Sequence, residues 1–383
     1  RLDRRHHAVD AAVIAMMNHS AAQTLVERDS LRLSQWITRE PETWKSYPFS
    51  EGQKKTRFKE WLDCMNTLLD LLNDALDSDR VSVTRCQRMS LGNSQAHAAT
   101  IRKMKHVELS SPMDADLIRR ASTPALYCAL TRLPEYSPEK GLPENRGREI
   151  VLNGRHIRST ETIDFFVSGA AQLMVRNGSA EIGDSIHHMR IYRYRKTGAK
   201  SQKYMYGMIR VFQIDLLHAS SEDLFAVQLP PQSVSVRYGD KNVVQAIQEG
   251  RAEYLGYIVP NDEILISYEG VQMKDSEKIG AYANDFSGTA SELAQRRHWV
   301  VVGSDVSKLA LRPSYLSEEG LENSGSESDR LSNQTRKVIE GKGWVVAVNI
   351  LAKYHPVVIR RNALGEPRFR TDSGMPVSWR WDR

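Results

Sequence analysis

The chain has 383 residues, of which 40% are hydrophobic and 26% charged, and a formal net charge of +6. Its length predicts two or three domains, and no apolar run approaches the roughly 18 residues that cross a bilayer, so we expect no membrane partner. The basic balance permits a polyanionic partner, and an N-terminus that is basic rather than apolar favours a cytoplasmic protein without a secretory leader.

The first predicted elements are two helices and a strand. Apolar residues at helical spacing predict a helix from Ala8 to about Ile37, and a broader apolar stripe predicts another from Thr56 to Leu76. A Pro-containing loop separates them, and Val81 to Arg85 has the pattern of a short strand. This order is typical of the closing part of an α/β unit whose sheet lies mostly outside this chain.

The middle of the chain changes from helical to alternating patterns. Small residues at 92–94 predict a turn into a short helix, and Met113 to Leu130 predicts another helix that Pro124 must bend or end. Beyond a Pro/Gly-rich loop, alternating stretches such as 186–195 and 204–214 predict antiparallel strands. We therefore expect a mostly antiparallel β domain here.

The last third continues the strand pattern on both sides of an acidic spacer. The spacer, residues 317–329, is rich in Ser, Gly and Glu and has almost no core-forming residue, which is typical of a flexible linker. The expected strands are Glu263–Tyr268, Trp299–Val302, Lys308–Arg312, Trp344–Leu351 and Pro356–Arg361. The predicted fold class is therefore multidomain α+β.

The opening segment RLDRRHHAVDAAVIAMMNH carries the clearest chemistry. On a helix, His7 and Asp10 are three residues apart and share one face with His6. A carboxylate beside an imidazole suits a divalent metal ion with a neighbouring general base. The alternative is a basic helix start in which acidic residues only offset Arg4 and Arg5.

Longer strings resemble one family. RRHHAVDAAVIA resembles the third RuvC motif of the CRISPR-associated RNA-guided DNA endonucleases of type II, in particular the compact type II-C members. RCQRMSLGNSQAHAAT resembles the loop that follows the nuclease fold in that family, and RKVIEGKGW with VVIRRNALGEPRFR resembles the C-terminal tail. The resemblance covers most of the chain, strongly at the first motif and more loosely after it.

The resemblance implies a divided nuclease. It assigns residues 1–86 to the third segment of an RNase H-like RuvC domain, with His7 as general base and Asp10 as ligand of Mg²⁺, or alternatively Mn²⁺. The family's other acidic segments, second nuclease domain and helical lobe have no counterpart in this chain. Two-metal hydrolysis needs several carboxylates around ions about 3.5–4 Å apart. We therefore expect the isolated chain to be catalytically silent.

The resemblance also implies a phosphate-binding loop, residues 87–112, with Ser94, His97 and Thr100 as the contacts to the target-strand phosphate. Small residues with hydroxyl, amide and backbone donors at a helix start suit this role. The alternative is an ordinary helix cap.

Residues 113–260 correspond to the family's wedge, which packs against guide RNA and the duplex. Arg190, Arg193, Arg195 and Lys196 alternate with apolar and tyrosine residues, so a basic face suited to RNA would oppose a buried one. The alternative is a solvated antiparallel sheet.

Residues 261–383 correspond to the domain that recognises the short duplex motif next to the target, the protospacer-adjacent motif. The candidate contacts are Arg312, Arg336, Lys337, Arg360 and Arg361, because long cationic side chains read base edges in the major groove. Each of them could equally contact a phosphate or be a surface charge.

The expected partners are guide RNA, a target DNA duplex and the rest of a nuclease chain in a prokaryotic cytoplasm, with no small-molecule substrate. Cys64, Cys86 and Cys128 lack the CxxC spacing of zinc sites and are expected to be reduced. One alternative is a free-standing basic RNA- or DNA-binding protein without nuclease activity. Another is a naturally split effector, completed by a second chain.

Overall fold

The computed structural model describes most of the chain. The described residues are 5–38, 52–77, 101–169, 171–176, 178–182, 185–195, 204–217, 223–269, 271–272, 278–286, 298–314, 316, 331–340, 342–361, 366–369 and 377–381. The predicted strand at 81–85 and the acidic spacer at 317–329 lie outside them. No helix of the described part is long and apolar enough to cross a membrane.

The N-terminal region forms three helices. They are α1 (His6–Ala15), α2 (His19–Thr38) and α3 (Gln53–Asp77). The helical pattern expected from Ala8 to about Ile37 is confirmed but divided in two, because the chain leaves the helix after α1 and the Asn18 side chain accepts a hydrogen bond from the Ala21 amide of α2. A side chain that caps a new helix in this way favours a break over continuation.

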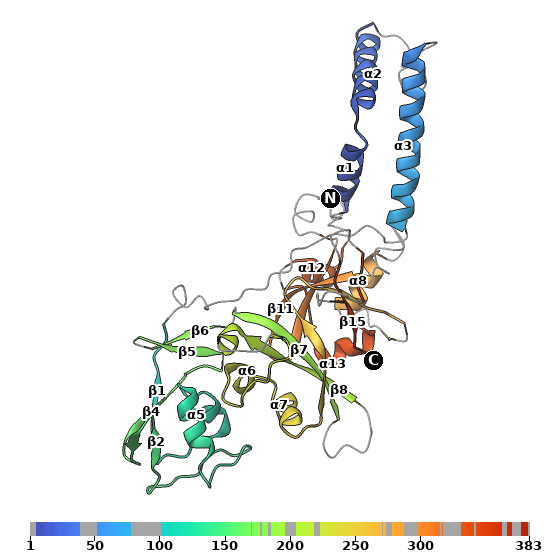
Figure 1. Cartoon of the computed structure of the whole chain (residues 1–383). Helices are drawn as coiled ribbons and strands as arrows, with labels where there is room; N and C mark the ends of the chain where they lie inside the picture. Colours follow the sequence, from blue (N-terminus) through green and yellow to red (C-terminus); the bar gives the residue numbers. More distant parts are fainter. Residues whose placement is uncertain are drawn as a thin grey trace.

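Helices α2 and α3 lie side by side and project from the strand-rich part of the chain (Figure 1). Arg57 of α3 joins them through a 2.9 Å ion pair with Glu27 and a hydrogen bond to Gln23. Phe58 is buried beside these contacts. The predicted second helix at Thr56–Leu76 is confirmed.

Residues 105–165 form short strands and two short helices around one small core, and the hairpin at 172–181 that follows packs with a second cluster. The elements are β1 (Lys105–Glu108), α4 (Ala115–Arg119), α5 (Pro124–Thr131), β2 (Ile150–Leu152), β3 (Arg155–Ile157), β4 (Thr162–Phe165), β5 (Gln172–Val175) and β6 (Gly178–Glu181). Asp114 and Thr123 cap α4 and α5, and Pro124 starts α5 at the first helical position, where its missing N–H costs nothing. Pro124 therefore ends the predicted 113–130 helix and starts a new one.

A three-stranded antiparallel sheet in the order β8-β7-β9 forms the middle of the chain. Its strands are β7 (Ile186–Arg195), β8 (Tyr204–Phe212) and β9 (Ala252–Ile258). The 3₁₀ helix η2 (Gln213–Leu216) and the helices α6 (Val234–Arg237) and α7 (Lys241–Gln248) lie between β8 and β9 in the chain. The hairpin predicted at 186–195 and 204–214 is confirmed.

A six-stranded antiparallel sheet in the order β13-β12-β11-β10-β14-β15 forms the C-terminal part. Its strands are β10 (Glu263–Leu265), β11 (His298–Ser304), β12 (Lys308–Pro313), β13 (Trp344–Ala347), β14 (Val357–Ile359) and β15 (Trp379–Arg380). The accompanying helices are α8 (Lys278–Phe286), α12 (Asn333–Ile339), α13 (Val348–Leu351) and η3 (Ala352–Tyr354). The strand predicted through Leu351 was wrong beyond Ala347, because α13 turns Val348 and Leu351 into the core.

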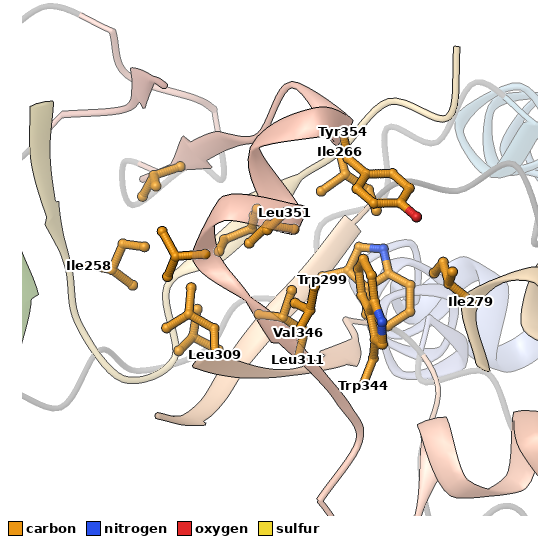
Figure 2. Packing of buried hydrophobic residues seen from close by; sticks show 14 of the residues in the cluster. Ile258, Ile266, Ile279, Trp299, Leu309, Leu311, Trp344, Val346, Leu351 and Tyr354 are labelled. Carbon is orange, nitrogen blue, oxygen red and sulfur yellow. The ribbon is translucent and has the colours of Figure 1, made fainter. Parts of the chain in front are cut away.

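The two sheets share their main hydrophobic core. Met189 of β7 and Met208 of β8 belong to the same buried cluster as Trp299 and Leu309 of the six-stranded sheet. Figure 2 shows Trp299, Trp344 and Tyr354 gathered at one end of this cluster. Because every strand pairing in the described residues is antiparallel, the expected mixed, mainly antiparallel fold is confirmed in outline.

Candidate nucleic-acid interface

A cationic groove lies on the outer face of the C-terminal sheet. Along β12, Leu309 and Leu311 point into the core, so Lys308, Ala310 and Arg312 share the opposite face. Lys342, in the turn before β13, lines the same groove, whose volume is about 580 Å³. In the described part of the chain, three cations thus surround one hollow that carries one acidic side chain, Asp305.

The groove has apolar walls as well as charge. Val302, at the bulge of β11, is 38% exposed, and Val345 of β13 is 41% exposed. Both line the groove beside the cations. This mixture of long donors and apolar surface suits the edge of a base or the face of a sugar, as well as a phosphate.

Gly343 allows the β13 turn to approach Arg312. It has a φ of +68°, and a Cβ atom at this position would lie 2.4 Å from the Leu311 carbonyl oxygen and 2.9 Å from Cγ of Arg312. Only glycine adopts this backbone conformation without strain and leaves room for the neighbouring strand. The close approach places Lys342 next to Arg312.

The other predicted duplex contacts lie in different surroundings. Arg336 is half-buried and Lys337 exposed, both on α12, which packs against α8. Arg361 pairs with Glu263 over 2.8 Å. The structure does not bring these side chains into the groove of Arg312.

Arg360 is an interior residue. Only 4% of it is exposed, and its guanidinium group pairs with the buried Asp262 over 2.8 Å. It also donates to the Tyr257 carbonyl oxygen and lies 4.1 Å from the centre of the Tyr257 ring. These contacts tie the six-stranded sheet to β9 and leave Arg360 in a structural position.

A second cationic surface lies at the tip of the β7–β8 hairpin. The guanidinium groups of Arg193 and Arg195 lie 4.8 and 5.0 Å from the centre of the Tyr204 ring, which is 40% exposed. Arg195 also donates to the Tyr204 hydroxyl over 3.1 Å, and Arg193 pairs with Glu253 over 2.7 Å. This hairpin-tip surface presents a partly exposed aromatic ring with two cations close to it.

Arg190 does not belong to that surface. It is 4% exposed and donates to the carbonyl oxygens of Val227 and Leu224 and to Nε2 of His188. Burial and the charge of Arg190 lower the pKa of His188 to about 2, which keeps its ring neutral. The basic residues of β7 therefore do not share one face, and this part of the expected pattern was wrong.

His7 and Asp10 both lie on α1 with exposed side chains. In the part of the chain that the structure describes, no three His, Cys, Asp or Glu side chains gather closely enough to hold a metal ion. His7 with Asp10 could thus supply one base and one oxygen ligand, but not a complete two-metal cluster. Ser94, His97, Thr100 and Lys196 lie outside the described residues.

Sequence reasoning missed Lys308, Lys342 and Tyr204. For Lys308, the available signal was its place in β12, where it alternates with buried leucines. For Lys342 and Tyr204 no local signal existed, because each gains its neighbours from a separate strand.

Four family models match successive parts of the chain. They are the RuvC endonuclease subdomain 3 at residues 1–90, the CRISPR-associated endonuclease Cas9 beta-hairpin domain at 94–184, the Topo homology domain of Cas9 at 186–260 and the Cas9 C-terminal domain at 261–382. Together they describe one class of protein, the CRISPR-associated endonucleases.

Relatives and solved structures agree with these matches. The Cas9 endonucleases of Actinomyces naeslundii and Corynebacterium diphtheriae are 39% and 37% identical over 99% of this chain, and the matched part makes up 34% and 33% of their own lengths. The chain belongs to the Cas9 family and corresponds to its C-terminal part. It spans about a third of the length of these relatives.

The crystal structure of the type II-C Cas9 from A. naeslundii is similar to this chain with a TM-score of 0.85 at 39% identity, and the match covers 99% of this chain and 42% of that one. C. diphtheriae Cas9, solved in complex with sgRNA and target DNA, is similar with a TM-score of 0.81 at 36% identity, over 99% of this chain and 41% of that one. The expected resemblance to type II-C members is confirmed.

Proposed function

We propose that this chain is the nucleic-acid-binding C-terminal part of an RNA-guided DNA endonuclease. The observation that carries the proposal is the groove of Lys308, Arg312 and Lys342, on a sheet that matches the Cas9 C-terminal domain. The similarity to a Cas9 solved with sgRNA and target DNA supports it. The family relationship favours this function over that of a free-standing basic protein with no nuclease relatives.

Within this proposal, the groove binds the DNA duplex beside the target and recognises the protospacer-adjacent motif. Arg312 is the leading candidate for a base contact, because a guanidinium group can donate two hydrogen bonds to guanine. Lys308 and Lys342 would hold the flanking phosphates as point charges. Arg336 and Lys337 remain candidates on α12.

The test is binding of the chain to a library of DNA duplexes at two salt concentrations. If Arg312 contacts a base, Arg312→Ala should relax the preference at one position, by about 1–3 kcal/mol. Lys308→Ala should instead weaken binding to all sequences. It should also reduce the slope of log affinity against log salt concentration by about one, because one phosphate contact is lost. The same measurement on Arg336→Ala tests the α12 candidate.

Arg380→Ala is the matched control, because Arg380 is an exposed residue of β15 on the same sheet and does not line the groove. It should leave sequence preference unchanged. If the unmodified chain binds all duplex sequences with equal affinity, its contacts are to phosphates alone, and the proposal of motif recognition is refuted.

We further propose that the hairpin-tip surface of Arg193, Arg195 and Tyr204 contacts guide RNA within a wedge-like domain, residues 113–260. An exposed aromatic ring flanked by arginines can stack on unpaired bases while the guanidinium groups reach phosphates. Arg190 and Arg360 take no direct part, because both are buried. Lys196 follows Arg195 in the sequence and remains a candidate for the same contact.

Residues 1–86 are proposed to be the third segment of an RNase H-like nuclease domain, in which Asp10 holds Mg²⁺ and His7 acts as base. Exposed apolar side chains on α1–α3 support an origin in a larger domain, among them Ile14, Val26, Trp36, Ile37 and Leu69. The ion would activate water and stabilise the leaving oxygen. Ser94, His97 and Thr100 are proposed to hold the target-strand phosphate.

The chain alone is proposed not to cut DNA, since His7 and Asp10 make only part of a two-metal site. Incubating the chain with plasmid DNA and Mg²⁺ or Mn²⁺ tests this. Ion-dependent cutting that disappears in Asp10→Ala would overturn the proposal. Cutting that requires a second chain would point to a naturally split effector.

A further inference from the structure

A cavity of about 530 Å³ lies where three parts of the fold meet, and its lining shares no residue with that of the groove of Arg312. One wall is α4 and the residues that follow it, and another is the turn between α6 and α7. Val306, between β11 and β12, and Gly169 also line it. The volume falls within the range of about 300–1,000 Å³ that is common for ligand sites.

A reciprocal arginine contact holds two of these walls together. Arg119 of α4 donates to the carbonyl oxygens of Arg237 and Gly239, over 2.8 and 2.9 Å. Arg237 of α6 donates in return to the Arg119 carbonyl oxygen over 2.8 Å and to that of Ala121. Each guanidinium group thus caps the end of the other residue's helix, so the cavity has a fixed shape.

Positive charge exceeds negative charge in this cavity. Among the described residues, its lining holds four cationic side chains, Arg119, Arg120, Arg237 and Lys241, and two acidic ones, Asp116 and Asp240. Asp116 is engaged by Lys241 over 2.6 Å, and Asp240 accepts from the first amides of α7. The carboxylates are therefore already committed to protein partners.

Three residues supply donors suited to a ligand, and the first is Lys241, whose ammonium group has three N–H donors and uses one of them on Asp116. Arg120 bonds to the carbonyl oxygens of Asp116 and Val167 through Nε and Nη1, and its Nη2 group has no hydrogen bond to another described residue. Tyr238 is 8% exposed, and its hydroxyl group lacks a hydrogen-bond partner among the described residues. A buried hydroxyl without a partner is costly, and it marks a place where an additional acceptor would be stabilised.

We propose that this junction cavity binds one phosphate group of a nucleic-acid backbone, through Arg120, Lys241 and the Tyr238 hydroxyl. A phosphate supplies the acceptor oxygens that these donors need and the negative charge that the lining lacks. The proposal deepens the proposed function, on which it rests, because it places a nucleic-acid contact where the beta-hairpin, Topo and C-terminal regions meet.

The test measures binding of the full 383-residue chain to single-stranded RNA and to duplex DNA over a range of salt concentrations. The variants are Tyr238→Phe and the double change Arg120→Gln with Lys241→Gln. The double variant should weaken binding of one of the two nucleic acids about tenfold and reduce its salt slope by about 0.7–0.9 for each phosphate that the chain no longer neutralises. Tyr238→Phe should weaken binding less and leave the melting temperature unchanged, since its hydroxyl loses no protein partner.

The matched control is Arg132→Gln with Lys140→Gln, which removes the same charge from exposed positions outside the cavity. It should retain the affinity and the salt slope of the unmodified chain. An equal loss in this control would overturn the proposal, because the effect would then be general electrostatics. Full affinity in folded cavity variants would also overturn it.

Inorganic phosphate provides a separate arm. Suppose that inorganic phosphate stabilises the unmodified chain against unfolding but does not stabilise the double variant, while both chains bind nucleic acid equally well. This result would identify a small-anion site and overturn the assignment to a nucleic-acid backbone. If the unmodified chain binds neither RNA nor DNA, the proposed function itself fails. If it binds through the Arg312 groove but not through the cavity, only the present inference fails.

Discussion

Arg361 and Glu263 form a two-point ion pair between neighbouring strands of the C-terminal sheet. Nε and Nη2 of Arg361 donate to the two carboxylate oxygens of Glu263, each over 2.8 Å. His298 of β11 contacts the same carboxylate. Burial by itself would raise the pKa of Glu263, but the hydrogen bonds from Arg361 and His298 outweigh it and lower the pKa to about 2.

This ion pair predicts a specific loss of stability in acid. Glu263 has an ordinary pKa of 4.5, so between pH 4.5 and about 2 the unfolded chain takes up a proton that the folded chain resists. The free energy of unfolding therefore falls in this window by up to roughly 3 kcal/mol and is unaffected by Glu263 above it. Urea unfolding of the chain and of Glu263→Gln across this range checks the prediction. The free energy of unfolding of the variant should not fall in this window as that of the unmodified chain does. If the two free energies fall in parallel, the loss of stability does not come from Glu263.

Arg148 is predicted to hold the small core of residues 105–165 together. Its side chain is fully buried and donates to the carbonyl oxygens of Leu109, Ser111 and Pro143 as well as to Glu135. Arg148→Met should cost about 3–5 kcal/mol, because these acceptors lose a buried cationic donor. Limited proteolysis and thermal unfolding measure the loss.

Arg146 provides the comparison for Arg148. Its side chain is 91% exposed and pairs only loosely with Glu144, over 3.5 Å. Arg146→Met should change stability by less than about 0.5 kcal/mol. Equal effects of the two substitutions would show that the internal contacts of Arg148 contribute little.

Alanine substitutions at Gly343 and Gly250 distinguish the stability cost of backbone strain from the cost of steric overlap. The two glycines have φ angles of +68° and +67°, but a Cβ atom at Gly250 meets nothing within 4 Å, whereas one at Gly343 overlaps the Leu311 carbonyl. Gly250→Ala should cost about 1 kcal/mol, and Gly343→Ala roughly 2 kcal/mol more. Denaturant unfolding measures both. Only Gly343→Ala should also weaken duplex binding, because it displaces Arg312.

Tyr204 tests the hairpin-tip surface. Tyr204→Leu removes the ring that lies against Arg193 and Arg195 and should weaken single-stranded RNA binding by about 1–3 kcal/mol if a base stacks there. Tyr204→Phe keeps the ring and should bind nearly as well as the unmodified chain. A loss in both variants would assign the effect to the hydroxyl group and its bond with Arg195 instead.

Much of the fold was predictable from local patterns. The β7–β8 hairpin follows from alternation, and α3 follows from its apolar stripe, because these periods are properties of single segments. The break between α1 and α2 and the helical turn at Val348–Leu351 were missed. At the first place the Asn18 side chain caps α2, and at the second the burial of Val348 and Leu351 overrides the strand pattern.

The candidate interface was only partly predictable. Arg312 and Arg190 were both named as cationic side chains on segments with a strand pattern, although Arg190 is buried. Nothing local distinguishes these two arginines. Arg190 is buried because its guanidinium group donates to the carbonyl oxygens of Leu224 and Val227. Lys342 lies beside Arg312 because the turn at Gly343 approaches the neighbouring strand closely.

The sequence by itself determined the family, the basic character and most of the strands and helices, because motifs and periodicity reside in contiguous residues. Only the tertiary structure decided which cations face outward and which donate their hydrogen bonds to carbonyl oxygens of the protein. It also decided where two arginines distant in the sequence line one cavity. Those outcomes depend on contacts between segments more than 100 residues apart, as between Arg119 and Arg237. Desolvation and hydrogen bonding at such contacts determine whether a cation remains available to a ligand.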